Sequence, residues 1–257
     1  MKISVIITSF NEAKFLSRAI DSFLEQDYLD KELLIIDDIS TDESHKIIAN
    51  YCQKFPGVVR WIKEKDYGVS HSRNLALKHV DGDLIGFLSA HDFLHKNFFE
   101  EMIYYAKKNP NFDVIYFNSY TVGDETNFLP SSFKKVTLEN LIEYAPIGSG
   151  SSFYYRKKLF DEFKFNEKNR YSMDYEFNLA IVARSNYVFY PVNIAAVFNV
   201  DLKENNSHSS ELKKSLEIIA VQFKYAKSLL EKLKIFWRTK KLIIKNRNAF
   251  NQISGSI

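Results

Sequence analysis

The hydrophobic and polar positions of the first 120 residues follow two alternating patterns. Short apolar runs rich in β-branched residues are typical of strands buried on both faces of a sheet. These runs occupy residues 3–8, 33–36, 58–62, 84–88 and 113–118. The segments between them carry apolar residues at helical spacing. Strands that alternate with helices in this way predict an α/β fold with a parallel sheet and right-handed crossovers.

The second half of the chain is less regular. Residues 151–155 and 187–200 have the pattern of strands, and a helix is predicted between them over 175–184. From residue 211 onward the pattern is helical, with apolar residues on one face at Leu216, Ile219, Phe223, Leu230 and Leu233. We therefore predict one domain over 1–204 and a helical tail over 205–257. Within the domain, we expect a nucleotide-binding half at 1–120 and an acceptor half at 121–204.

Composition predicts an ordinary globular protein, with 46% apolar and 26% charged residues. The N-terminus becomes polar too early for a signal peptide, and no apolar stretch is long enough to cross a bilayer. The single cysteine, Cys52, has no partner for an internal disulfide. These features predict a cytoplasmic protein.

Charge is distributed unevenly along the chain. Residues 205–257 hold eleven Lys or Arg and three Glu, which leaves 24 basic and 29 acidic residues in 1–204. Basic and apolar residues alternate in the tail, and this mixture suits a helix lying on an anionic membrane surface. Packing of the same apolar residues on the rest of the chain, or in a homo-oligomer, remains an equal alternative. Clustered Arg and aromatic pairs are too few to predict nucleic-acid binding. The basic residues of the tail are Lys232, Lys234, Arg238, Lys240, Lys241, Lys245 and Arg247.

Polar and acidic residues follow each of the first four predicted strands, where ligands bind in open parallel sheets. They occupy residues 8–12, 37–38, 63–66 and 89–92. Neither a glycine-rich dinucleotide-binding turn nor a P-loop is present in the sequence. A diphosphate at this edge would therefore need a metal or a basic residue, and Asp92 is placed to hold Mg²⁺ or Mn²⁺ through oxygen.

Four segments follow one another in a characteristic order. They are SVIITSFNE at 4–12, ELLIIDDISTD at 32–42, GVSHSRNLAL at 68–77 and GDLIGFLSAHD at 82–92. Together they resemble family two of the inverting glycosyltransferases, which have the GT-A fold. The resemblance covers residues 1–120 and is extended by YSMDYEFNLAIVAR at 171–184. It implies a Rossmann-like, mostly parallel sheet flanked by helices, here with a C-terminal helical extension.

The resemblance implies a donor-nucleotide site. Thr8, Phe10 and Glu12 would contact the base and ribose, and Asp38 would bind the base, usually uracil. Arg73 would lie near the diphosphate or support the donor loop; an ion pair with nearby acids is the alternative.

The metal motif departs from the family pattern, which usually has two or three aspartates after the fourth strand. This chain has Ser89-Ala90-His91-Asp92, in which Asp92 keeps the metal-ligating position. His91 is a candidate second ligand, and the alternative is a partly buried histidine bonded to a loop. The departure keeps open a second hypothesis, a catalytically degenerate binding or scaffold protein with the same fold.

The family's catalytic base corresponds to Asp174 in the segment 173–177, with Glu176 as a competitor. The alternative is that Asp174 only caps a helix beginning near Tyr175. The predicted reaction is a single displacement. It moves a sugar from a nucleotide-diphospho-sugar, with UDP as the expected nucleotide, to a hydroxyl of a glycan or lipid-linked acceptor.

Overall fold

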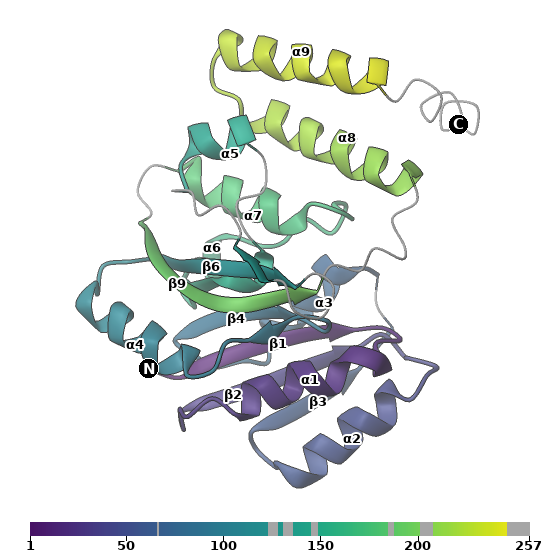
Figure 1. Ribbon diagram of the computed structural model, residues 1–257, viewed down its shortest axis with the longest axis vertical. Helices are drawn as coiled ribbons and strands as arrows, with labels where there is room; N and C mark the ends of the chain where they lie inside the picture. The colour runs from purple at the N-terminus through teal and green to yellow at the C-terminus, as the bar shows by residue number, and fades with distance from the viewer. Residues whose placement is uncertain are drawn as a thin grey trace.

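A computed structural model describes residues 1–65, 67–122, 128–130, 136–144, 149–184, 188–200 and 208–245, and they form a mixed sheet flanked by helices (Figure 1). Four parallel strands in the order β3-β2-β1-β4 make up its N-terminal block. These strands are β1 (Ile3–Ser9), β2 (Lys31–Asp37), β3 (Val59–Lys63) and β4 (Leu84–Ser89). The prediction of a parallel α/β block is confirmed.

The sheet continues beyond β4 with a change of direction. Strand β8 pairs antiparallel with both β4 and β6, so it separates two strands that run the same way. Strand β9 then pairs in parallel with β6, and the short strands β5 and β7 pair antiparallel with β9 and β6. Most paired residues lie in the parallel ladders, as expected for this fold class. The bounds are β5 (Phe93–Leu94), β6 (Val114–Val122), β7 (Phe128–Pro130), β8 (Phe153–Arg156) and β9 (Phe189–Val200).

Helices cover both faces of the sheet. One core cluster packs α1 (Ala13–Leu24), α2 (Ser44–Lys54) and α4 (Phe98–Lys108) against one face. A second cluster, on the other face, includes residues from the remaining helices. These are α3 (Val69–Ala76), α5 (Leu138–Tyr144), α6 (Leu159–Glu162), α7 (Met173–Val182), α8 (His208–Tyr225) and α9 (Leu229–Lys245). In Figure 1, α8 and α9 form the layers farthest from the sheet. None of the helices described combines the length and hydrophobicity that a bilayer crossing requires.

The helical tail is broken into two helices, where the sequence pattern predicted one. The Ser228 hydroxyl accepts from the amide of Glu231 at 3.1 Å, and the Glu231 carboxylate accepts from the amides of Lys227 and Ser228. This capping box starts a new helix at Leu229.

The predicted single apolar face of the tail is also wrong. Phe223, Leu230 and Leu233 are exposed, whereas Val221 and Ile235 are buried. The break changes the rotation of α9 relative to α8, so apolar residues aligned by one continuous helical spacing point in different directions.

A buried carboxylate, Glu32, links β2 to neighbouring strands and loops. Its side chain is 4% exposed and accepts hydrogen bonds from the Ser4 hydroxyl at 2.6 Å and the Asp81 amide at 2.8 Å. Lys2 and Arg60 lie within 3.0 and 2.9 Å of the same side chain. Burial alone would raise the pKa of Glu32, but the bonds from Ser4, Asp81 and Lys2 outweigh it and hold the pKa below its usual value.

We predict that Glu32→Gln lowers the free energy of unfolding by about 2 kcal/mol at neutral pH, because it removes the buried charge that pairs with Lys2 and Arg60 and accepts the Ser4 and Asp81 hydrogen bonds. A carboxylate whose pKa is lowered by folding contributes stability above its unfolded pKa. That contribution is lost as the pH falls through the folded pKa. Urea unfolding across acidic pH should therefore show a smaller loss of stability in the variant than in the parent.

Glu43→Gln is the matched control, because Glu43 forms an exposed i,i+3 pair with Lys46 and should contribute little. Equal acid sensitivity in Glu32→Gln and the parent protein would contradict the role given to Glu32.

Candidate functional site

The carboxyl ends of β1, β2 and β4 lie at one edge of the sheet. Thr8 of β1 is level with Ser89 of β4, and the amide of Asp38, just after β2, donates to the carbonyl of Ser9 at 3.0 Å. The Asp38 side chain is half-buried, and Phe10 follows β1 with 55% of its surface exposed. The structure therefore brings the predicted donor residues to one edge and leaves Phe10 accessible.

The loops after β1 and β2 hold each other in place. Asn11, at φ 55°, accepts the Thr41 amide on its side-chain oxygen at 2.9 Å. In return, Asp42 accepts the amide of Ala13 in the first turn of α1 at 3.0 Å. Reciprocal bonding of this kind fixes the edge before any ligand binds.

His91 lies between the fourth strand and α1. Its Nε2 is 3.0 Å from the Ser89 hydroxyl, and its Nδ1 is 3.9 Å from a Glu12 carboxylate oxygen. The Glu12 carboxylate raises the pKa of His91 above its usual value and outweighs the opposing effect of burial, and Asp92 adds to the rise. Both ring nitrogens of His91 thus face polar groups of the protein.

Asp92 is buried and directed toward the 3₁₀ turn η1 (Gly150–Ser152). Its carboxylate accepts the Ser151 hydroxyl at 2.8 Å, and the same hydroxyl accepts the Ser89 amide at 3.2 Å. Within the part of the chain that the structure describes, no three His, Cys, Asp or Glu side chains form a metal-binding group. The residues present fit a cation held jointly by Asp92 and a ligand's oxygens, not one held by the protein alone.

Asp174 lies on the other side of η1. It occupies the first turn of α7, whose N-cap is Ser172, so the alternative that Asp174 caps this helix is wrong. One carboxylate oxygen forms an ion pair with Arg73. The other faces Gly150, where an added Cβ would lie 2.6 Å from it. Glycine at this position is what lets the carboxylate approach the turn so closely.

Two aromatic rings hold Arg73 in place. The guanidinium lies 4.8 Å from the ring centre of Phe87 and 5.1 Å from that of Phe165, and the side chain is 11% exposed. Cation–π contacts of this kind orient the planar group toward Asp174. The ion pair considered from the sequence is thus present, although Arg73 and Asp174 are 101 residues apart.

Glu176, the competitor of Asp174, is occupied elsewhere. Its buried carboxylate contacts Lys224 of α8 at 2.7 Å, Asn166 at 2.9 Å and Asn169 at 3.0 Å. Burial would raise the pKa of Glu176, but these partners hold it below its usual value. Both oxygens therefore belong to a structural network on the side of α7 that faces α8.

A carboxylate that sequence reasoning missed, Glu217 of α8, holds the segment that enters α7. It accepts the amides of Arg170 at 2.9 Å, Tyr171 at 2.8 Å and Ser172 at 2.8 Å. The Ser172 hydroxyl donates to it at 2.9 Å. A single side chain thus binds amides that precede the helix carrying Asp174. No local motif marks Glu217, because its partners lie about 45 residues away.

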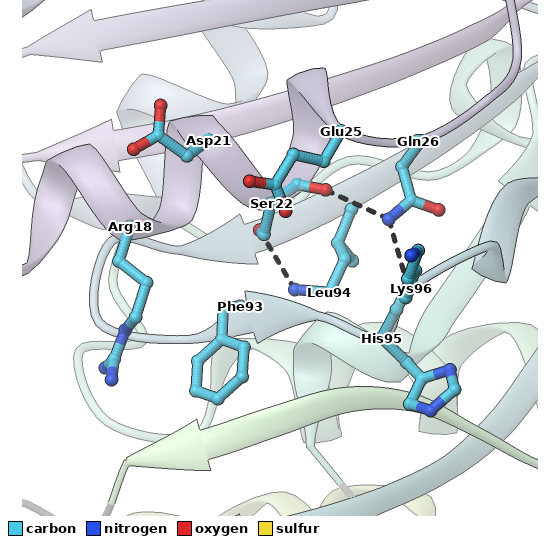
Figure 2. A pocket seen from close by; sticks show the side chains of 9 residues that line it. All are labelled: Arg18, Asp21, Ser22, Glu25, Gln26, Phe93, Leu94, His95 and Lys96. Atoms are coloured by element: carbon cyan, nitrogen blue, oxygen red, sulfur yellow. Dashed lines mark hydrogen bonds between the residues drawn. The ribbon is translucent and has the colours of Figure 1, made fainter.

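A polar stripe along α1 and the turn that follows it, also missed, holds the segment that follows Asp92. The Ser22 hydroxyl accepts the amide of Leu94 at 3.0 Å, and the Gln26 side chain donates to the carbonyl of His95 at 3.0 Å (Figure 2). Arg18, one turn before Ser22, belongs to the same stripe. The i, i+4, i+8 spacing of these three polar residues could have predicted from the sequence that they share one side of the helix.

A pocket of about 610 Å³ adjoins this stripe. The Arg18 guanidinium lies over the Phe93 ring at 4.5 Å, beside the segment that begins at Asp92 (Figure 2). Burial lowers the pKa of Arg18, whereas the Asp92 charge acts to raise it. The lining residues are Arg18, Asp21, Ser22, Glu25, Gln26, Phe93, Leu94, His95 and Lys96.

Solved structures share this fold. The poly(ribitol-phosphate) β-N-acetylglucosaminyltransferase TarS from Staphylococcus aureus, residues 1–349 in complex with UDP-GlcNAc, superimposes with a TM-score of 0.68 at 21% identity, over 86% of this chain and 66% of that one. A mannosyltransferase from Pyrobaculum calidifontis in complex with GDP-Man and Mn²⁺ superimposes with a TM-score of 0.67 at 17% identity, over 99% of this chain and 73% of that one. The GT-A fold is therefore confirmed.

Sequence relatives agree with the fold. The chain is 27% identical to the poly(ribitol-phosphate) β-N-acetylglucosaminyltransferase TarP of S. aureus over 267 aligned residues, which cover 99% of this chain and 77% of TarP. It is 31% identical to an uncharacterized glycosyltransferase of Haemophilus influenzae over 151 residues, and this match spans 59% of this chain and 58% of that protein. The sequence model described as Glycosyl transferase family 2 matches residues 4–164, which is more than half of the chain. This protein belongs to glycosyl transferase family 2.

Proposed function

We propose that the chain is an inverting glycosyltransferase that moves a sugar from a UDP-linked donor to a hydroxyl of a glycan or lipid-linked acceptor. The observation that carries the proposal is the short turn η1, which has Asp174 against Gly150 on one side and Asp92 bonded to Ser151 on the other. The proposed base, Asp174, and the proposed cation ligand, Asp92, therefore both adjoin this one turn. Family membership and the TarS complex with UDP-GlcNAc support a UDP-linked donor.

The donor nucleotide would lie along the edge formed by β1 and β2. We assign Thr8, Phe10 and Glu12 to the base and ribose, and Asp38 to the uracil. The exposed ring of Phe10 and the half-buried carboxylate of Asp38 support this assignment, because both are accessible at the same edge. The ion pair of Arg73 with Asp174 favours a role in positioning the base over direct binding of the diphosphate.

Asp174 is the proposed base. Its carboxylate takes the proton of the acceptor hydroxyl as that oxygen attacks the anomeric carbon, and the bond from that carbon to the diphosphate breaks. A single displacement inverts the anomeric centre, so an α-linked donor gives a β-linked product. The competitor Glu176 is less suited, because Lys224 and two asparagines already bind its carboxylate.

A divalent cation, Mg²⁺ or Mn²⁺, is part of the proposal. Asp92 would hold it together with diphosphate oxygens and water, which suits a hard cation. Such a cation supplies charge neutralisation to the departing diphosphate. His91 would act at most as a weak second ligand, because its Nε2 faces the Ser89 hydroxyl at 3.0 Å and its Nδ1 faces the Glu12 carboxylate at 3.9 Å.

We predict that Asp174→Asn leaves UDP binding nearly unchanged and lowers turnover about a hundredfold or more, because the variant cannot accept the proton. Gly150→Ala should lower turnover in the same direction, since the new methyl group would displace the Asp174 carboxylate. The measurements are UDP release from UDP-sugars in the presence of Mn²⁺ and calorimetric UDP binding.

Asp161→Asn, at an exposed position on α6, is the matched control and should behave as the parent protein. Transfer by Asp174→Asn at the parent rate would remove Asp174 from the mechanism. A parent protein that binds UDP but turns over none of a broad donor panel would favour the degenerate binding protein instead.

We further predict that UDP binding depends on a divalent cation, is lost in Asp92→Ala and is only weakened in His91→Ala. A hard oxygen ligand should matter more than an imidazole for a hard divalent cation. Calorimetry with Mn²⁺ and with EDTA measures the effect, with Asp161→Ala as the control. Equal UDP affinity of the parent protein in both conditions would rule out the cation.

A further inference from the structure

Helix α9 forms the outermost layer of the molecule, above α8 and α5 in Figure 1. One side of it is anchored to the body of the protein. Ile235 is fully buried, and the Arg238 guanidinium donates to the backbone carbonyls of Ile142, at 3.2 Å, and Glu143. These contacts fix which side of α9 faces inward.

The opposite side of α9 is an exposed apolar face. Its residues recur every three or four positions, so they lie on one side of the helix. Ile235 is rotated away from Leu233 by about 160° at 100° per residue, which is why one is buried and the other is not. The outer apolar face consists of Leu229 (75% exposed), Leu230 (64%), Leu233 (46%), Phe236 (55%) and Trp237 (56%). An exposed apolar patch of this kind marks an interaction surface.

Exposed lysines border the outer apolar face on both flanks. Lys232 lies on one flank, and Lys234 and Lys241 lie on the other, while Lys240 extends over the Trp237 ring at 5.1 Å. The helix contains one acidic residue, Glu231, and its carboxylate is bonded to the backbone at the start of the helix. The surface is therefore mostly apolar, with lysines on both flanks and Lys240 on the same side at its C-terminal end; one acidic residue, Glu143 of α5, also adjoins Leu230, Leu233 and Trp237. Arg247 lies outside the described residues.

We infer that the outer apolar face of α9 docks on an anionic lipid surface. Its apolar side chains would enter the boundary between headgroups and acyl chains, with Trp237 at that boundary and the lysines against the lipid phosphates. A second copy of the chain is a poorer occupant, because this face on both copies would bring the same lysines together. An anionic membrane neutralises those charges and covers the apolar residues at the same time.

The test uses the full chain and point variants, because α8 and α9 pack on the rest of the molecule and truncation would disturb it. Vesicles of phosphatidylcholine alone are compared with vesicles that also contain phosphatidylglycerol, at low and high salt. The parent protein should co-sediment with the anionic vesicles at low salt and be released at high salt.

Two variants separate the apolar and the charged contributions. The double variant Phe236→Ser, Trp237→Ser should weaken binding at least tenfold. The triple variant Lys232→Gln, Lys234→Gln, Lys241→Gln should weaken it about a hundredfold, from the usual contribution of each basic residue near such a surface. The controls are Leu29→Ser and the triple variant Lys54→Gln, Lys78→Gln, Lys107→Gln, all at exposed positions of the N-terminal half. Both should bind as the parent protein does.

Thermal unfolding and UDP binding of every variant should match the parent protein, which distinguishes lost docking from lost folding. Equal sedimentation with neutral and anionic vesicles, or none with either, would overturn the inference. A concentration-dependent dimer that dissociates in the Phe236→Ser, Trp237→Ser variant would overturn it too, in favour of a second copy as the occupant.

Discussion

The antiparallel pairing of β4 with β8 joins the two halves of the molecule, and the geometry of the site depends on it. Gly86 of β4 faces Tyr154 of β8 so closely that a Cβ would overlap the ring. Because η1 leads directly into β8, this pairing brings Gly150 and Ser151 to the carboxyl end of β4. Asp92 and Asp174, which are distant in sequence, then contact neighbouring residues of one turn.

The strands of the N-terminal block were predictable because burial on both faces of the sheet leaves a continuous apolar run. The insertion of β8 between β4 and β6 was not, since strand order in that region depends on pairing between residues about 70 positions apart. The sequence does contain a signal for the break between α8 and α9. Ser228 and Glu231 form a capping box. The apolar residues before and after it nearly fit a single helical period, however, and therefore suggested one continuous helix.

The ordered motifs of the family led to the residues of the candidate site, and several of them meet in space. They did not predict what holds those residues. Arg73 is fixed by the rings of Phe87, in β4, and Phe165, in the loop after α6. Ser151 carries no motif of its own and acquires its role only from the fold. Supporting contacts of this kind depend on tertiary distance, which a single sequence does not reveal.

The contact of Glu217 with residues 170–172 has a consequence for exchanging segments between this chain and a relative. The match to the family's sequence model ends at residue 164, before the helix that carries Asp174 and before the helix that holds its entry segment. A hybrid protein that took α8 from one relative and the segment before α7 from another would separate a carboxylate from the amides it binds. The two segments should therefore be exchanged together, as one unit.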